Sequence, residues 1–273
     1  MRSLAIGHGL FAEGVDAEAC GLLECAAWPA GAFFSSMNLL TRTWRSSLGK
    51  KYIMAITGCA LFGFVIAHLL GNLQIFLGPG PLNRYGHFLQ TTPEVLWPAR
   101  FGLLAMVALH ILAAVKLSRE NKLARPVPYA QEELVAASYA SRTMLMSGII
   151  VAVFVVYHLL HFTVQVQGIN LVGEDFARLE DQKQRHDIYR MMLAGFSSFW
   201  VSGFYVIGLG LLCLHLSHGV GSMFQSVGWK NRSYGKFIDG VAKVSALLIF
   251  LGYCSIPLAV LADRRLKLIH IFQ

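Results

Sequence analysis

Charged residues are scarce in this sequence. Asp, Glu, Lys and Arg make up 14% of the 273 residues, whereas hydrophobic residues make up 55% and the mean hydropathy is +0.55. These values lie well outside the average for soluble proteins, so a soluble globular domain is excluded. Disorder is excluded because 12% of the residues are aromatic, and the 26 glycines show no period typical of a fibrous protein. The composition predicts an integral membrane protein.

The sequence contains few cysteines, and their number is odd. Three of the five, Cys59, Cys213 and Cys254, lie inside long apolar runs, where a thiol behaves as a small hydrophobic group. No disulfide framework is therefore predicted. Cys20 and Cys25 have no neighbouring Cys or His pair that would complete a zinc site.

Five runs of the sequence are nearly free of charge and long enough to cross about 30 Å of hydrocarbon as helices. They are residues 52–77, 101–115 extended by its flanks, 143–167, a stretch within 191–229, and 244–262. The run 191–229 is too long for one bilayer crossing and must overhang it. All five exceed the usual length of a strand, so the predicted fold class is all-α with five transmembrane helices.

Basic residues at the ends of the runs predict the topology. Four of them precede the first run: Arg42, Arg45, Lys50 and Lys51. Only Arg84 and Arg100 lie between the first run and the second. By the positive-inside rule, the N-terminal side of the first run is cytoplasmic, which places the C-terminus outside a cytoplasmic (inner) membrane. The net charge of +8 is explained in this way, because the basic residues form no stripe that would fit nucleic acid.

The first 40 residues differ from the rest. They are mildly acidic and rich in Gly and Ala, with no basic segment ahead of an apolar core, so a signal peptide is not expected. Met37 would also serve as a start. We expect residues 1–40 to form a peripheral or poorly ordered extension, and residues 41–273 to form the transmembrane domain.

Six histidines lie within the first four runs: His68, His110, His158, His161, His215 and His218. An ionisable group at membrane depth costs a few kcal/mol or more, so each one is a candidate functional residue. For a single histidine, a neutral imidazole bonded to a carbonyl group is an equally good interpretation. The four runs contain no Asp or Glu that would complete a conventional proton relay. The pattern therefore favours binding of a metal or haem.

The depths of four histidines fall into two tiers. Counted from the middle of their runs at about 1.5 Å per residue, His68 and His158 lie about 5 Å toward the outside. His110 and His215 lie about 3 Å and about 7 Å toward the cytoplasm. Each tier takes its two imidazoles from two different helices, which is the arrangement that a bis-histidine b haem requires. We call His68 and His158 the distal pair, and His110 and His215 the proximal pair.

The other two histidines follow these at a spacing of three residues. His161 follows His158 and His218 follows His215, so each lies about 60° around the helix from its neighbour. Only one of each two need be an axial ligand. The remaining imidazoles lie nearer the membrane surface, where they would either bond a haem propionate or a quinone, or serve in packing.

Several segments resemble the dihaem cytochrome b subunit of succinate dehydrogenases and fumarate reductases, and the resemblance covers residues 40–262. The segments are Ser46 to Lys51, Ala67 to Asn72, Leu109 to Leu112, Tyr157 to Phe162, and His215 to Gly219 followed by Gly228-Trp229. The resemblance implies a membrane anchor whose first four helices hold two b haems. It assigns the distal haem to His68 and His158 and the proximal haem to His110 and His215, which agrees with the depths.

The same resemblance implies partners and a reaction. Electrons would pass between a flavoprotein and iron–sulfur subunit pair and a membrane quinone, commonly menaquinone, in the respiratory chain and the tricarboxylic acid cycle. The chain itself carries no flavin or iron–sulfur motif, so it would not oxidise succinate alone. The partners would dock on the basic cytoplasmic face, formed by Arg42, Arg45, Lys50, Lys51, the second-to-third connection, Lys230 and Arg232.

Two points stay open from the sequence alone. Candidate hydrogen-bonding residues for the quinone occur at both ends: Gln74, Arg84, His87 and Gln165 outside, and Arg45, Ser46 and Ser47 inside. Two other functional classes compete with the first. One is a proton-coupled transporter that uses intramembrane histidines, although neither inverted repeats nor broken helices are visible. The other is the cytochrome b anchor of a hydrogenase or formate dehydrogenase.

Overall fold

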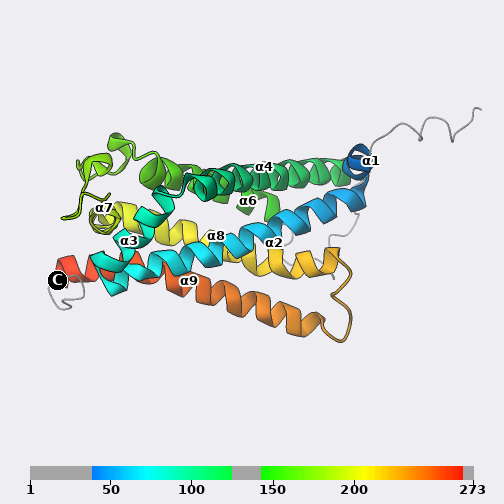
Figure 1. Ribbon diagram of the computed structural model, residues 1–273. Coiled ribbons are helices and arrows are strands. Elements are labelled where there is room, and N and C mark those ends of the chain that lie inside the picture. Colours follow the sequence, from blue (N-terminus) through cyan, green and yellow to red (C-terminus); the bar gives the residue numbers. More distant parts are fainter. Residues whose placement is uncertain (1–38, 125–142, 267–273) are drawn as a thin grey trace, which may run out of the picture. The chain divides into compact units, whose positions relative to one another are not determined.

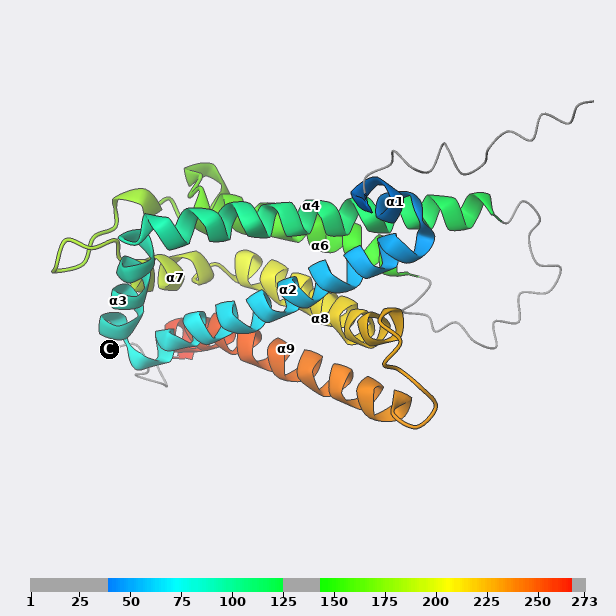
Figure 2. The ribbon, with the colours of Figure 1, turned by 45° about the vertical axis from the view of Figure 1, so that its right-hand side comes forward.

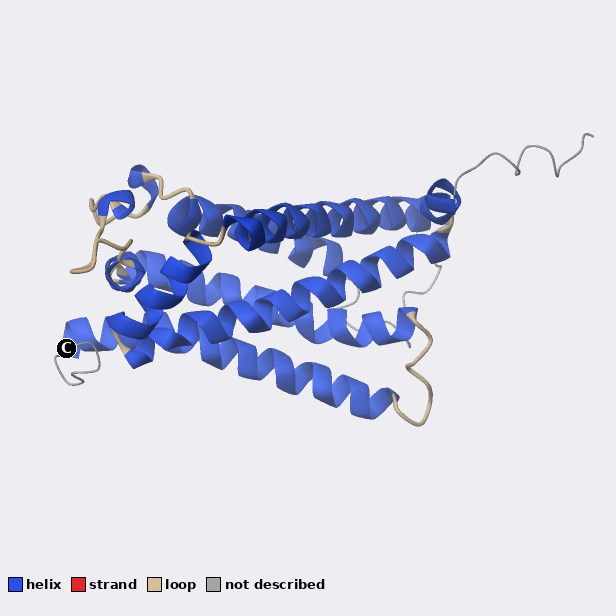
Figure 3. Cartoon of the chain, viewed as in Figure 1, coloured by secondary structure: helices blue, strands red, loops and turns tan. Residues whose placement is uncertain are grey.

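The computed structural model describes residues 39–124 and 143–266. Within these ranges every regular element is a helix, and the only strand-like pairing is an isolated bridge between Glu180 and His186 (Figure 3). The chain divides into two compact units, residues 1–42 and 43–273. The described residues of the first unit begin helix α1 (Leu39–Arg45). The predicted extension therefore falls almost entirely outside the described residues.

Five long helices are apolar enough to cross a membrane, which confirms the all-α fold class and the five spans (Figure 1). They are α2 (Ser47–Asn72), α4 (Pro93–Leu123), α6 (Met144–His158), α8 (Phe199–Ser226) and α9 (Gly235–Leu266). A 3₁₀ turn, η1 (Leu73–Leu77), continues α2, and a π-helical turn, η2 (Leu159–Thr163), continues α6. The start of α2 and the end of α9 lie at opposite ends of the second unit, as an odd number of crossings requires (Figure 1).

The short elements gather at one end of the second unit, where α2 finishes and α4 begins (Figure 1). They are α3 (Pro79–Gln90), η3 (Gln167–Ile169), η4 (Phe176–Arg178) and α7 (Ile188–Phe196). We call this the capped end, and the other the opposite end. In the predicted topology the capped end faces outward.

The long uncharged run 191–229 is divided between two helices. It breaks at Ser197 and Ser198, where Ser198 has an extended backbone and Ser202 donates a hydrogen bond of 2.7 Å to the Phe196 carbonyl group. Only α8 is long enough to cross the bilayer, and α7 belongs to the cap. The overhang expected from the sequence is therefore a separate short helix.

The second span is longer than its uncharged core of residues 101–115, because α4 includes charged residues that are accommodated near its end. The Lys116 ammonium lies 5.2 Å from the centre of the Trp44 ring, and Glu120 forms an ion pair of 2.9 Å with Lys50. These contacts allow the helix to continue to Leu123.

Helix α8 is the centre of the packing. It contacts α2, α6 and α9, while α2 also packs along α4. A Cβ on Gly208 would clash with the Phe154 ring, so the absence of a side chain at this position allows α6 to approach closely. Both ribbon views place α9 on the side of the bundle away from α4 (Figures 1 and 2). Cys254 and Ile256 of α9 belong to the buried core, so the fifth span packs against the other helices as part of the same bundle.

Candidate functional site

The distal pair is brought together by two helices that are far apart in the sequence. His68 on α2 and His158 at the end of α6 have ring centres 5.8 Å apart, with an angle of 80° between the rings. Two imidazoles on opposite sides of one metal ion, each with a metal–nitrogen bond of about 2 Å, have ring centres about 6 Å apart. The separation and the chemistry of the two donors therefore fit one iron between them.

Aromatic side chains surround the distal pair. Phe64 stacks on the His68 ring at 5.3 Å, and Tyr253 from α9 lies 6.2 Å from the same ring. Tyr253 is fixed because its hydroxyl donates a hydrogen bond of 2.8 Å to the Val65 carbonyl group. The distal site is thus an apolar, ring-lined environment of the kind that suits a porphyrin.

His161 lies behind this site and shares a partner with His158. Its Nδ1 is 3.0 Å from the Tyr205 hydroxyl oxygen, which is 3.5 Å from Nδ1 of His158. The side chain of His161 is fully buried and lies against Phe176 of η4. Its Nε2 has no hydrogen-bond partner among the residues that the structure describes. His161 belongs to the π-helical turn, an irregularity that is frequent at functional sites.

The proximal histidines each face a hydroxyl group on a neighbouring helix. Nδ1 of His110 on α4 is 3.0 Å from the Thr57 hydroxyl oxygen on α2, and Nδ1 of His215 on α8 is 3.2 Å from the Ser147 hydroxyl oxygen on α6. The two imidazoles are also near enough for their charges to interact. The structure therefore places the second predicted pair at the level of Thr57 and Ser147, without a ring contact between the two imidazoles within the described residues.

The spacing of the tiers can be measured along two helices. Thr57, which contacts the proximal pair, stands 11 residues before His68, and Ser147 stands 11 residues before His158. At about 1.5 Å per residue, both helices place the tiers about 16 Å apart. This exceeds the roughly 10 Å expected from depths in the apolar runs, because those depths assumed that every helix is centred on the same plane.

His218 does not join the proximal pair. Its Nε2 is 3.1 Å from the Ser222 hydroxyl oxygen on the same helix, and it is close to the charges of Lys230 and Asp239. Lys230 and Asp239 form an ion pair of 2.6 Å at the opposite end. His218 therefore faces the α8–α9 connection.

A cavity of about 430 Å³ opens at the capped end, lined by Gln74, Pro81, Arg84, Tyr85 and Phe88. The Tyr85 ring lies against the backbone of Gly71, where an added Cβ would be 2.9 Å from the ring. Gly71 is three residues beyond His68, so the cavity lies beside the distal tier. Gln165 faces elsewhere, with its amide 3.0 Å from His186, and His87 is exposed.

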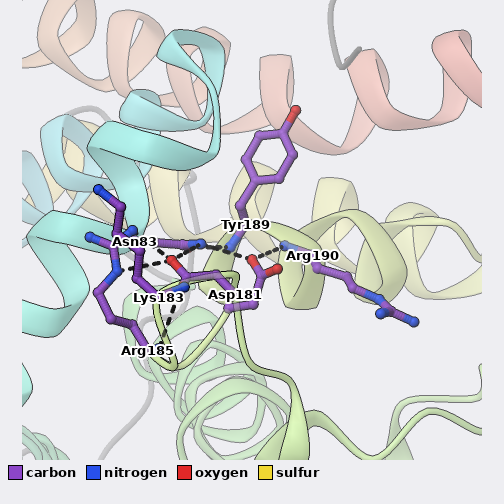
Figure 4. Close-up of polar contacts among 7 residues, drawn as sticks. Asn83, Asp181, Lys183, Arg185, Tyr189 and Arg190 are labelled. Atoms are coloured by element: carbon purple, nitrogen blue, oxygen red, sulfur yellow. Dashed lines mark hydrogen bonds and ion pairs between the residues drawn. The ribbon is translucent and has the colours of Figure 1, made fainter.

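A network of polar contacts closes the capped end (Figure 4). The buried Asn83 amide of α3 donates to Asp187 at 3.0 Å and to Asp181 at 3.5 Å, and its oxygen accepts a bond of 3.0 Å from the Tyr189 backbone N–H. Hydrogen bonds from the Arg185 guanidinium hold the pKa of the Asp181 carboxyl well below its usual range. These contacts join α3 to α7 and to the loop before it.

Lys50 corrects the expected docking face. The side chain is fully buried, and its ammonium pairs with Glu120 while donating to the carbonyl groups of Trp44 and Arg45. A residue that ties α2 to α4 in this way is not available to a partner. Arg45 and Lys51 remain exposed at the same end, together with Arg232.

Three residues that contact the histidines were not expected from the sequence: Thr57, Ser147 and Tyr205. The first two had a signal, because each is followed by glycine and stands at the same distance before a distal histidine. No sequence pattern marked Tyr205 as a contact of the histidines, since tyrosines are frequent in membrane helices.

No group of three or more His, Cys, Asp or Glu within the described ranges could hold a metal ion. Comparisons with protein-family models, curated proteins and solved structures found no match to this chain. The functional interpretation therefore depends on the residues and their geometry. The part of the basic face in residues 125–142 lies outside the described residues.

Proposed function

We propose that the chain is the membrane anchor and electron-transfer cytochrome b subunit of a succinate:quinone oxidoreductase, with two bis-histidine b haems. The observation that carries the proposal is the pairing of His68 with His158. A second tier, His110 on α4 and His215 on α8, contacts Thr57 and Ser147, which lie about 16 Å from the first pair along α2 and α6. When bound, the haems would carry single electrons between the two tiers. A transporter has no need of histidines paired at a metal-spanning distance.

The chain's own residues would hold and shield these groups. His68 and His158 would bind the distal iron from α2 and α6, and His110 and His215 the proximal iron from α4 and α8. Phe64 and Tyr253 would exclude water from the distal site, since both rings lie against His68. Four imidazoles in two pairs leave no axial position open, so both irons would be six-coordinate and suited to electron transfer rather than to oxygen chemistry.

The quinone would enter at the capped end. Among the candidate residues, Gln74 and Arg84 line the same cavity, where their N–H groups could donate hydrogen bonds to a quinone carbonyl oxygen. Tyr85 and Phe88 supply apolar walls for the ring. Because Tyr85 rests on Gly71, one turn from His68, this location would give electrons a short path from the distal pair.

The dicarboxylate chemistry would belong to a flavoprotein and an iron–sulfur subunit. The opposite end supports docking, because Arg45, Lys51, Arg232 and Lys236 are exposed there. The proximal pair is the nearer tier to this end. In the predicted topology that side is cytoplasmic, so electrons would enter at the proximal pair and leave at the distal pair, or the reverse for fumarate reduction.

The test is purification of the tagged chain from its own membranes in a mild detergent. We expect it to co-purify with a flavoprotein and an iron–sulfur protein, and succinate to reduce b-type absorbance in the complex. Hydrogenase or formate dehydrogenase subunits in their place would contradict the assignment while leaving the haems intact. A chain with no reduced-minus-oxidised haem spectrum would favour the transporter.

A further inference from the structure

We propose that Thr57 and Ser147 are positioning residues for the proximal pair, which fix the tautomer of His110 and His215 so that each Nε2 is free to bind iron. This inference rests on the proposed function and deepens it. The tautomer of each histidine depends on which neighbouring atom accepts the hydrogen of the hydroxyl group.

The Thr57 hydroxyl group donates its hydrogen within its own helix. Its oxygen lies 2.7 Å from the carbonyl oxygen of Ile53, and the carbonyl group can only accept, so the single hydroxyl hydrogen is donated there. The contact of 3.0 Å with Nδ1 of His110 then has only one arrangement, in which Nδ1 carries a hydrogen and donates it to Thr57. The side chain of Thr57 is buried, so water does not compete. His110 is thereby the tautomer whose lone pair is on Nε2.

Ser147 repeats this arrangement in the other half of the bundle. Its hydroxyl oxygen lies 3.0 Å from the Met144 carbonyl oxygen and 3.2 Å from Nδ1 of His215. The hydrogen again belongs to the carbonyl contact, so His215 donates from Nδ1 and presents Nε2. Second-shell acceptors of this kind orient a metal-binding imidazole and increase its donor strength.

A repeated sequence pattern supports the same role. Thr57-Gly58 precedes His68, and Ser147-Gly148 precedes His158, with nine residues between the glycine and the histidine in both cases. A Cβ on Gly58 would lie 3.4 Å from Cε1 of His110, and a Cβ on Gly148 would lie 3.4 Å from Cε1 of His215. The hydroxyl group and the glycine thus form one contact site for the Nδ1–Cε1 edge of an imidazole. We call this contact site a seat. The helix pairs α2–α4 and α6–α8 are therefore equivalent. Each helix pair contributes one seat, one histidine of the distal pair and one histidine of the proximal pair.

The distal pair has no equivalent seat. Within residues 39–124 and 143–266, no hydroxyl group is seen hydrogen-bonded to His68, and His158 shares the Tyr205 hydroxyl with His161 at the longer distance of 3.5 Å. Removing the two hydroxyl groups should therefore act on the proximal haem alone. The loss of the N–H···O bond weakens imidazole donation to ferric iron, so the midpoint potential of the proximal component should rise.

The experiment uses the intact complex with Thr57→Val, Ser147→Ala and the double variant. Thr57→Ser and Ser147→Thr keep the hydroxyl groups. The matched control is Ser245→Ala on α9, which removes a hydroxyl that bonds only its own helix, at 3.1 Å from the Ala242 carbonyl oxygen. Each variant is titrated potentiometrically while its haem absorbance and its low-spin ferric electron paramagnetic resonance signals are recorded.

We expect Thr57→Val and Ser147→Ala to raise the potential of the same spectral component, and proximal haem retention to weaken about 10-fold in the double variant. The distal component, the hydroxyl-retaining variants and Ser245→Ala should match the wild type. If a hydroxyl-free variant loses the proximal haem, retention in its hydroxyl-bearing counterpart supports the proposal, and loss in both overturns it.

The proposed function and the positioning role would fail in different ways. A wild-type chain without two haems would overturn the proposed function. A wild-type chain with two haems whose proximal potential is unchanged in both hydroxyl-free variants would overturn the positioning role alone, as would an equal shift of both components.

Discussion

The distal and proximal pairs use the same donor but are held in different ways. Nδ1 of His110 and Nδ1 of His215 each lie within hydrogen-bond distance of a hydroxyl group on a facing helix, at 3.0 and 3.2 Å. His68 is held by ring contacts, and His158 shares Tyr205 with the buried His161. The proximal site is therefore defined by hydrogen bonds between helices, whereas the distal site is defined by packing.

The surroundings of the two tiers differ accordingly. Short helices, a cavity and the Asn83 network all lie at the capped end, close to the distal pair. The opposite end is held by the ion pair between the buried Lys50 and the partly exposed Glu120, and it carries exposed basic residues. In the proposed function, a quinone would approach the distal tier from the capped end, and a partner protein would dock at the opposite end, nearer the proximal tier.

Removing one ligand should have the strongest effect. Replacing His68 or His158 by Leu should abolish the distal haem, because the remaining imidazole cannot restore coordination on both sides of the iron. Replacing His110 or His215 should abolish the proximal haem and leave the distal one. Redox titration of the four variants measures this. If the His68 and His110 variants lost the same component, the pairing would be wrong.

A smaller effect should follow from opening the cap. Asn83→Ala removes the contacts of the amide with two carboxylates and the hydrogen bond that its oxygen accepts from the Tyr189 backbone N–H, which should cost about 2 kcal/mol of stability. The distal haem should then be lost first on heating. Asn231→Ala is the control, because this exposed asparagine makes its bonds within a loop at the opposite end. Equal heat sensitivity of both haems would show that the cap does not protect the distal tier.

Substituting the histidines outside the pairs should have a weaker effect still. His161→Leu removes one partner of Tyr205, so it should shift the potential of the distal component while both haems stay bound. His218→Leu should leave both components unchanged, since His218 contacts Ser222 on its own helix. Loss of the distal haem in the His161 variant would instead identify His161 as the axial ligand in place of His158.

The weakest effect is a pH dependence confined to the cap. Hydrogen bonds from Arg185 lower the pKa of Asp181 in the folded protein, so this carboxylate stabilises the fold above its unfolded pKa of about 4. That contribution should be lost as the pH falls from about 4 toward the lower folded value. Limited proteolysis of residues 164–187 should accelerate over this range, with less dependence in Asp181→Asn. An identical acid profile in the variant would assign the effect to other groups.

Much of the fold could be predicted because charge is so rare in the spans. A helix that enters a bilayer cannot carry many unpaired charges, so the absence of Asp, Glu, Lys and Arg from residues 52–77 marks a span directly. The break at Ser197 and Ser198 left no such mark, since serine and glycine also occur inside membrane helices. The break depends on the packing of α7 against α3 within the cap.

The site could be predicted in part for a similar reason. Histidines are conspicuous in apolar runs, and their positions within those runs are enough to group them into tiers. The burial of Lys50 could not be foreseen, because its partner Glu120 lies 70 positions later and meets it only through the register of α2 against α4. The contact between Tyr205 and His161 could not be foreseen either. It depends on the packing of α8 against the π-helical turn that carries His161.

The proposed function requires that each tier of two histidines holds one haem, and this requirement can be checked by quantifying haem b against protein in the purified wild-type chain. We predict two haems per chain, both low-spin in the ferric state and resolved as two components in a redox titration. A single haem per chain, or a high-spin signal with an open axial position, would contradict the two-tier arrangement.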